Sequence, residues 1–143
     1  MTLKLEFPHG LPAFETEKRF RLTQSLERAP LLFLESETTP GLSFLLLPLA
    51  AIDPGYRLAL SADDRELIDA PLAPGNDPNL VCLAVLTAGE DSPPTANLLA
   101  PVVINMATNI AVQAVRADTV YSHRHPITAL QSTTGAREPK ASC

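Results

Sequence analysis

The amino-acid sequence predicts an all-β single domain, antiparallel and either barrel-like or sandwich-like, with one short helix near residues 61–69. Three observations support this prediction. Apolar and polar residues alternate over many short segments, and turn-forming residues separate these segments about every eight to twelve positions. One place in the chain carries a clear helix start. The length of 143 residues suits one hydrophobic core.

The first third of the chain is predicted to form four strands. Alternation over residues 2–7 indicates a strand with one face on a core. Two prolines around a glycine then predict a rigid loop over 8–12, and alternation returns over 18–23. Residues 31–36 and 42–47 are predicted to pair as a hairpin across a short polar turn.

The middle of the chain carries the predicted helix and the most apolar strand. A short alternating strand is expected over 56–60. Ser61 can accept a hydrogen bond from the first backbone donors of a helix, and Asp63 and Asp64 suit the positive end of its dipole. Residues 80–87 are the most hydrophobic segment, so we expect this strand to be central.

The stretch Thr95–Asn105 is almost uncharged and β-branched toward its end, which predicts a core strand. Pro101 cannot donate to a β-ladder, so it predicts an edge, a bulge or a strand start. Asn97 and Asn105 lie near the two ends of the stretch. An amide at the end of a buried strand needs partners, usually backbone groups of a neighbouring turn.

The C-terminal part is predicted to complete the domain. Asparagine tolerates the left-handed conformation, so we expect a tight turn at Thr108–Asn109 before a return strand over 110–115. Residues 121–127 close the folded part. No apolar pattern continues beyond residue 131, which predicts a folded domain over 1–130 and a disordered tail over 131–143.

Composition narrows the possible functions. Aromatic residues make up only 5% of the chain, which leaves little material for stacking nucleic-acid bases. The net charge of -5 disfavours a phosphate-binding surface as the main function and favours a soluble protein or a basic partner. The longest apolar run, Leu42–Ile52, is too short to span a bilayer. We therefore expect no direct nucleic-acid binding and no membrane association.

The two cysteines and the N-terminus predict a cytoplasmic protein. Cys82 lies in an apolar run and is expected to be a small buried hydrophobe, whereas Cys143 is expected to be a free thiol. The N-terminus alternates and does not form the apolar block of a signal peptide. Without a disulfide framework, the cytoplasm is the natural compartment.

A catalytic or metal site is conceivable at His123 and His125, which share one face of an extended chain near Asp118. A third ligand of the expected type is not obvious, and the sequence contains neither a nucleophile elbow nor a phosphate-binding glycine loop. We predict no enzymatic activity, no cofactor and no metal. A small metal-dependent or hydrolytic enzyme that uses these three residues is the alternative.

Three segments carry short motifs, at residues 7–15, 97–105 and 121–127. Their sequences are F-P-H-G-L-P-A-F-E, N-L-L-A-P-V-V-I-N and Y-S-H-R-H-P-I. In order and spacing they resemble the motifs F-P-x-G-L-P-G-F-E, N-L-x-A-P-[IV]-V-I-N and Y-x-x-R-H-P-[LI] of the FliW family of flagellar assembly factors. The resemblance covers about residues 4–130, and three motifs in order are far more specific than one.

The resemblance implies a β-rich, barrel-like cytoplasmic domain without catalysis. Proteins of this family bind newly made flagellin in the manner of a chaperone, and they bind the RNA-binding translational repressor CsrA. When flagellin leaves by export, the free factor captures CsrA and relieves repression of flagellin translation. For this chain the resemblance implies flagellin and CsrA as partners and a monomer when free. The acidic charge balance fits a basic partner.

Two places depart from the family pattern. Ala13 replaces the usual glycine, so a positive φ at this position would strain the turn. The family often has a basic, glycine-bearing loop after Asn105, whereas residues 107–112 carry no charge here. If this hairpin tip touches a partner, we expect the contact to be less electrostatic.

No residue is assigned a catalytic, cofactor-binding or metal-binding role. A purely structural β-domain that serves only as an oligomer subunit is a third reading of the chain. The residues expected to mark the fold or a protein interface come from the three motifs: Phe7, Pro8, Gly10, Pro12, Phe14, Glu15, Asn97, Pro101, Asn105, Arg124, His125 and Pro126.

Overall fold

The structure of the chain is a computed structural model that describes residues 2–56, 58, 60–70, 79–87, 93–115 and 121–127. The predicted boundary at residue 130, the predicted tail over 131–143 and Cys143 lie outside these residues. Within the described ranges the elements are β1 (Thr2–Glu6), β2 (Arg19–Gln24), η1 (Leu26–Arg28), β3 (Leu32–Ser36), β4 (Ser43–Pro48), α1 (Leu49–Ile52), α2 (Ala62–Leu67), β5 (Leu80–Thr87), β6 (Thr95–Asn105), β7 (Ile110–Gln113) and β8 (His125–Pro126).

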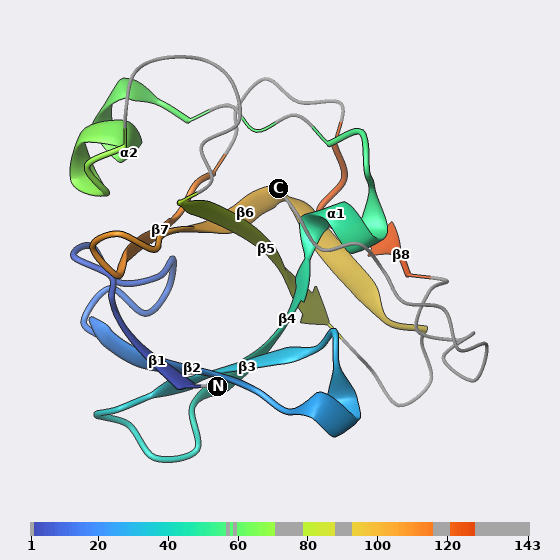
Figure 1. Ribbon diagram of the computed structural model, residues 1–143, viewed down its shortest axis with the longest axis horizontal. Coiled ribbons are helices and arrows are strands. Elements are labelled where there is room, and N and C mark those ends of the chain that lie inside the picture. Colours follow the sequence, from blue (N-terminus) through green and yellow to red (C-terminus); the bar gives the residue numbers. More distant parts are fainter. Residues whose placement is uncertain are drawn as a thin grey trace.

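Seven of the described strands close into a barrel (Figure 1). The neighbours run in the order β5-β4-β3-β2-β1-β7-β6, and pairing between β5 and β6 closes the ring. Strand β8 lies outside the ring, where His125 pairs with Ala96 at the start of β6. Of the two architectures predicted from the sequence, the chain therefore adopts the barrel.

The contact between β1 and β7 is parallel, whereas the other neighbours in the ring are antiparallel. It consists of the register pair Glu6 with Ile110, and the Glu6 amide also donates to the Asn109 carbonyl at 3.0 Å. Seven strands in a closed ring cannot alternate in direction all the way round. One parallel contact is therefore a consequence of closure.

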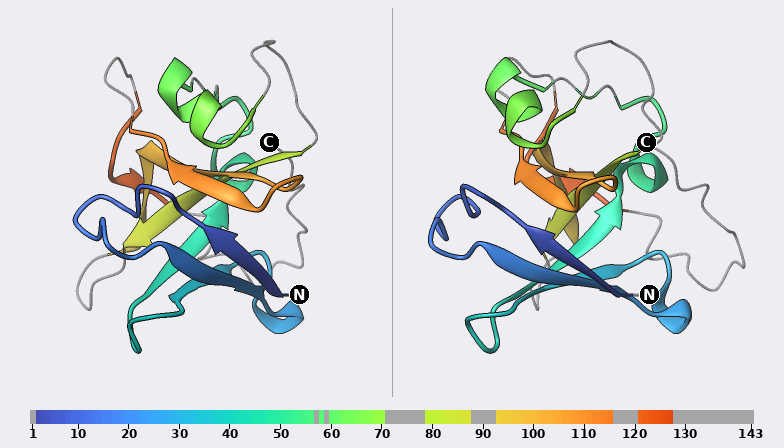
Figure 2. Two further views of the ribbon diagram at one scale, coloured as in Figure 1. Left: turned by 90° about the vertical axis from the view of Figure 1, so that its left-hand side faces the viewer. Right: turned by 60° about the vertical axis from the view of Figure 1, so that its left-hand side comes forward.

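Two hydrophobic clusters stabilise the barrel. The first fills its interior: Leu5, Phe7, Leu11, Phe20, Leu22, Leu32, Leu34, Leu46, Leu83, Val102, Ile104 and Ala111. The second includes outward-facing residues of β4–β7 together with residues that cover them: Leu47, Leu49, Ile68, Cys82, Ala84, Leu86, Ala96, Leu98, Val103, Val112, Ala114 and Ile127. Helix α1 contacts β4 and β5, and α2 contacts β7 (Figure 2).

Strands β5 and β6 are buried on both faces, which explains their nearly continuous apolar sequences. In β5, Leu83 belongs to the interior cluster and Cys82 to the outer one. In β6, Val102 and Val103 divide between the clusters in the same way. The prediction of a central β5 is confirmed, and so is the burial of Cys82, which is 2% exposed.

Most strands occur where alternation places them. Strands β5 and β6 have the predicted bounds, and β3 and β4 form the predicted hairpin with Leu34 opposite Phe44. The predicted turn at Thr108–Asn109 is present, with Asn109 at a φ of 61°. The following strand is shorter than predicted, because β7 ends at Gln113.

The predicted helix start is confirmed. The Ser61 Oγ accepts a hydrogen bond from the Asp64 amide at 3.0 Å, and Asp63 and Asp64 lie in the first turn of α2. Two short helical segments, η1 and α1, were not predicted, because three or four residues are too few to show a helical period. No helix in the described ranges is long and apolar enough to cross a membrane.

The predicted strand over 56–60 is wrong. Tyr56, Leu58 and Leu60, the described residues of this segment, belong to no strand. All three are partly buried against the outer hydrophobic cluster. Alternation reports that one side of a segment is buried, and here that burial occurs without a partner strand to form a ladder.

Candidate functional site

Strand β6 contains a large bulge near its centre. Leu83 of β5 pairs with Val102, and two residues further along β5, Val85 pairs with Asn97. Between these two pairs, β5 advances by two residues and β6 by five. The additional residues of β6 lie outside the β5–β6 ladder. Pro101 lies inside this bulge, where its missing N–H removes no ladder hydrogen bond to β5. Of the three placements predicted for Pro101, the bulge is the one found.

The side chain of Asn97 holds the bulge in place. Its Oδ1 accepts hydrogen bonds from the Leu99 amide at 3.0 Å and from the Ala100 amide at 3.1 Å. Both donors lie in the segment that has left the ladder, so they need another acceptor. Asn97 therefore acts as a cap for the backbone of its own strand.

The bulge also connects segments that are far apart in the sequence. The Tyr56 hydroxyl donates to the Leu98 carbonyl at 2.8 Å, and the Leu98 amide donates to the Ser122 carbonyl at 2.9 Å. The Gln113 Nε2 donates to the Ala100 carbonyl at 3.0 Å. These bonds join β6 to β7, to the segment after α1 and to the 121–127 segment.

At the other end of β6, Asn105 anchors helix α2 to the barrel. Its side chain is buried, and the Nδ2 donates to the Ile68 carbonyl at 2.8 Å and to the Asp69 carbonyl at 3.3 Å. Its Oδ1 accepts from the Ala107 amide at 3.0 Å. The amide thus satisfies backbone groups of two turns, as the sequence predicts for this position.

The 7–15 loop packs into one end of the barrel. Phe7 is fully buried, and its ring meets the Phe20 ring edge-on with centroids 5.2 Å apart. Gly10 follows with a φ of 66°, and a Cβ at this position would lie 2.6 Å from the Phe14 carbonyl oxygen. Leu11 and Phe14 then exchange two backbone hydrogen bonds of 2.7 and 3.2 Å. The sequence of this loop therefore specifies a tight turn.

Ala13 has a φ of 71°, so the residue that replaces the family glycine does occupy the left-handed region. We expect Ala13→Gly to stabilise the protein by about 0.5–1 kcal/mol, because relief of the strain outweighs the entropy that glycine adds to the unfolded chain. The measurement is the urea midpoint. Ala107→Gly is the control, because Ala107 is also exposed and is not among the residues with positive φ. If Ala13→Gly and Ala107→Gly destabilise the protein equally, the backbone at Ala13 is not strained.

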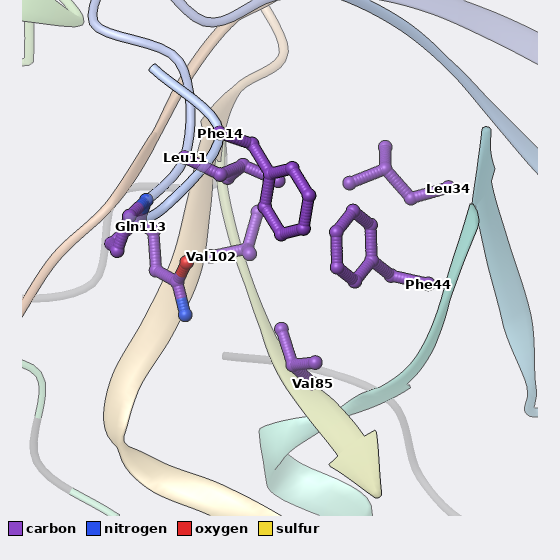
Figure 3. A pocket seen from close by; sticks show the side chains of 8 residues that line it. Leu11, Phe14, Leu34, Phe44, Val85, Val102 and Gln113 are labelled. Carbon is purple, nitrogen blue, oxygen red and sulfur yellow. The ribbon is translucent and has the colours of Figure 1, made fainter. Parts of the chain in front are cut away.

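The loop and the bulged strand meet at an apolar pocket, here called the Phe14 pocket. Its volume is about 200 Å³, and the rings of Phe14 and Phe44 meet edge to face in its wall (Figure 3). Gln113, whose amide also holds the bulge, contributes its polar group. The lining residues are Leu11, Pro12, Phe14, Leu34, Phe44, Val85, Val102 and Gln113. The first two motifs therefore come together in space, which their sequence separation alone does not reveal.

Glu17 ties the end of this loop to the β3–β4 hairpin. One carboxylate oxygen accepts hydrogen bonds from the Ser36 hydroxyl at 2.5 Å and the Thr38 hydroxyl at 2.9 Å, and the other accepts from the Thr39 hydroxyl at 2.6 Å. These bonds, first that from Ser36, hold the pKa of the Glu17 carboxyl below its ordinary value. The sequence predicts the polar turn between β3 and β4. It does not predict that the Glu17 carboxylate binds this turn, because the two segments are about twenty residues apart.

The lowered pKa makes the contribution of Glu17 dependent on pH. The folded state binds its proton less tightly than the unfolded chain, so the hydrogen bonds contribute full stability above pH about 4.5 and lose it as the pH falls through the folded-state pKa. We expect wild type to be more stable than Glu17→Gln at pH 7, and the difference to shrink below pH about 4.5. Urea unfolding across this range measures it. A constant difference would contradict the assignment.

The third motif lies beside the second. In β8, His125 pairs with Ala96 and Pro126 with Thr95, and the Ile127 amide donates to the Pro94 carbonyl at 3.3 Å. The side chain of Arg124 is exposed. Strand β6 is therefore the element around which all three motifs gather.

The predicted site residues divide by exposure. Phe7, Gly10, Pro101 and Asn105 are buried, whereas Pro12, Phe14, Glu15, Arg124 and Pro126 are exposed, and Pro8, Asn97 and His125 lie between these limits. The buried residues shape the turn, the bulge and the helix anchor, so their places are explained by folding. The exposed residues of the 7–15 loop are the ones available to a partner.

The residues of the alternative enzyme do not form a described site. His123 is exposed and His125 is partly exposed, and Asp118 lies outside the described residues. Among the residues that the structure covers, no three His, Cys, Asp or Glu side chains are grouped so that they could hold a metal ion. Within the described ranges, no grouping of side chains supports the alternative.

Comparisons with known proteins extend over almost all of the described chain. The protein-family model described as FliW protein matches residues 2–127. The flagellar assembly factor FliW of Bacillus subtilis (strain 168) is 32% identical over 122 residues, which cover 85% of this chain and 82% of that protein. The flagellar assembly factor FliW of Geobacillus sp. (strain WCH70) is 35% identical over 122 residues, which cover 85% and 81%.

The fold also matches a solved structure. A crystal structure of the flagellar assembly factor FliW is similar to this chain with a TM-score of 0.73 and 32% sequence identity, over 86% of this chain and 84% of that one. The family match contains all three motifs, which the structure gathers around β6. The chain belongs to the FliW family.

Proposed function

We propose that this chain is a non-enzymatic flagellar assembly factor that binds flagellin and the translational repressor CsrA, and so couples flagellin export to flagellin translation. The observation that carries the proposal is the family match over residues 2–127. The curated relatives are named flagellar assembly factors, which supports the role in assembly. Binding of newly made flagellin resembles the action of a chaperone.

The charge of the chain supports a basic partner. The net charge is -5, and the exposed residues of α2 include the carboxylates Asp63 and Glu66. A protein that binds RNA carries positive surface charge, and opposite fields accelerate the encounter of two proteins. We therefore expect faster association with CsrA at low ionic strength.

The proposal also covers where and how the protein works. Because flagellin is translated in the cytoplasm and CsrA represses that translation, we place the chain there, as a monomer when free. It acts by contacts with proteins, and the proposal requires neither direct nucleic-acid binding nor a membrane. The folded domain is taken to span residues 1–130.

A pull-down tests the proposal. The tagged chain is incubated with a lysate of the flagellated bacterium that encodes it, and the captured proteins are identified by mass spectrometry. An unrelated acidic β-domain of similar size is the control for non-specific capture. We expect flagellin and CsrA to be enriched on the chain over the control. Recovery of neither protein would overturn the proposal.

A further inference from the structure

The 7–15 loop buries one large apolar side chain and exposes the next. Leu11 is 4% exposed, whereas Phe14 is 38% exposed at the Phe14 pocket. The Phe14 ring stands edge-on to the Phe44 ring with centroids 5.7 Å apart and an interplanar angle of 75° (Figure 3). An exposed aromatic ring beside an apolar pocket has the composition of a binding hot spot.

The loop presents this ring in a fixed position. The Leu11 and Phe14 backbones bond to each other, and the Glu17 amide donates to the Phe14 carbonyl at 3.0 Å. Gly10 leaves no room for a Cβ against the Phe14 and Glu15 carbonyls. A partner that contacts Phe14 therefore loses little free energy in ordering the loop.

The charged residues that follow Phe14 most closely in the sequence are acidic. Glu15 and Glu17 follow Phe14 in the chain, and the Glu15 carboxylate accepts from the Ala13 amide at 3.1 Å, which keeps it at the loop. The nearest cation in sequence, Lys18, donates its Nζ to the Pro8 carbonyl at 2.9 Å. A binding segment with basic residues complements this surface.

We propose that the Phe14 pocket is the docking site for the basic partner of this chain, and that it receives one large apolar side chain flanked by basic residues. The inference rests on the proposed function. It assigns the pocket to the RNA-binding repressor and not to flagellin, because a protein that binds RNA carries positive surface charge, which complements the acidic residues of the loop.

Titration calorimetry with purified CsrA and purified flagellin tests the assignment. Phe14→Ser removes the ring, and Leu26→Ser is the matched control, because Leu26 is 95% exposed and is not among the residues that line the pocket. We expect Phe14→Ser to weaken the affinity for CsrA about tenfold or more, and Leu26→Ser to leave it unchanged. Unchanged affinity of Phe14→Ser for flagellin shows that the variant is folded.

Glu15→Gln tests whether the negative charge of the loop contributes to binding of CsrA. The amide keeps an acceptor for the Ala13 amide and removes the charge, so the loop conformation is preserved. We expect affinity for CsrA to fall about threefold at low salt and the difference to vanish at high salt.

The outcomes separate the two proposals. If wild type binds neither protein, the proposed function fails. If wild type binds CsrA and Phe14→Ser binds it equally well, the pocket assignment alone is overturned. Equal losses of CsrA and flagellin affinity in a variant with an unchanged thermal midpoint would also overturn it, because the pocket would then not discriminate by charge.

Discussion

Gly10→Ala is expected to lower the free energy of unfolding by about 2–4 kcal/mol, because two costs coincide at this position. Its φ of +66° is unfavourable for any residue with a Cβ. The added Cβ would also lie 2.6 Å from the carbonyl oxygens of Phe14 and Glu15, which are backbone atoms and cannot turn aside. The measurement is urea unfolding followed by circular dichroism.

Gly41→Ala is the matched control for this prediction. Gly41 has a φ of +85°, but nothing lies within 4 Å of an added Cβ. Only backbone strain remains, partly offset by the reduced entropy of the unfolded chain, so we expect a loss of about 0.5–1 kcal/mol. If the two variants lose equal stability, the close approach of the 7–15 backbone to Gly10 is not a feature of the folded protein.

Asn105→Asp is expected to destabilise the protein by about 3–5 kcal/mol at neutral pH. The change replaces the Nδ2 that donates to the Ile68 and Asp69 carbonyls with an oxygen, and it places a negative charge at a site that is 5% exposed. Asn105→Ala leaves the same carbonyls without this donor but adds no charge, so we expect about 1–3 kcal/mol. Urea unfolding and hydrogen exchange of the α2 amides measure the loss.

Asn97→Asp is the contrasting substitution on the same strand. The Asn97 side chain accepts two hydrogen bonds through its Oδ1, and no donor role is needed to hold the bulge. An aspartate oxygen accepts from the same amides, and the residue is only partly buried. We expect the stability to stay within about 0.5 kcal/mol of wild type. A large loss at Asn97 with none at Asn105 would reverse the roles assigned to the two amides.

Much of the fold follows from local patterns in the sequence. Strand β6 is β-branched between turn-forming residues, and the Ser61 start of α2 combines a cap with two acidic residues. These signals are local, so a single sequence contains them in full. The barrel rather than a sandwich, and the parallel contact of Glu6 with Ile110, depend on how distant strands pair. No local pattern in the sequence predicts which distant strands pair.

The candidate site shows the same division. The motifs single out Phe14 and Asn97, but the sequence gives no reason to place Phe44 or Gln113 beside them. Phe44 reaches the pocket through its register in the β3–β4 hairpin, and Gln113 through its hydrogen bond to the bulge of β6. These neighbours can be predicted only when the strand register and the position of the bulge are already known.

The proposed function requires this chain to exchange one protein partner for the other. The most direct measurement is competition: fluorescently labelled CsrA is bound to the chain, unlabelled flagellin is added, and the anisotropy of the label is followed. The account predicts that anisotropy falls to the value of free CsrA as flagellin saturates the chain. A ternary complex, seen as anisotropy that stays at or rises above the value of the CsrA complex, or failure of CsrA to bind at the start, would contradict it.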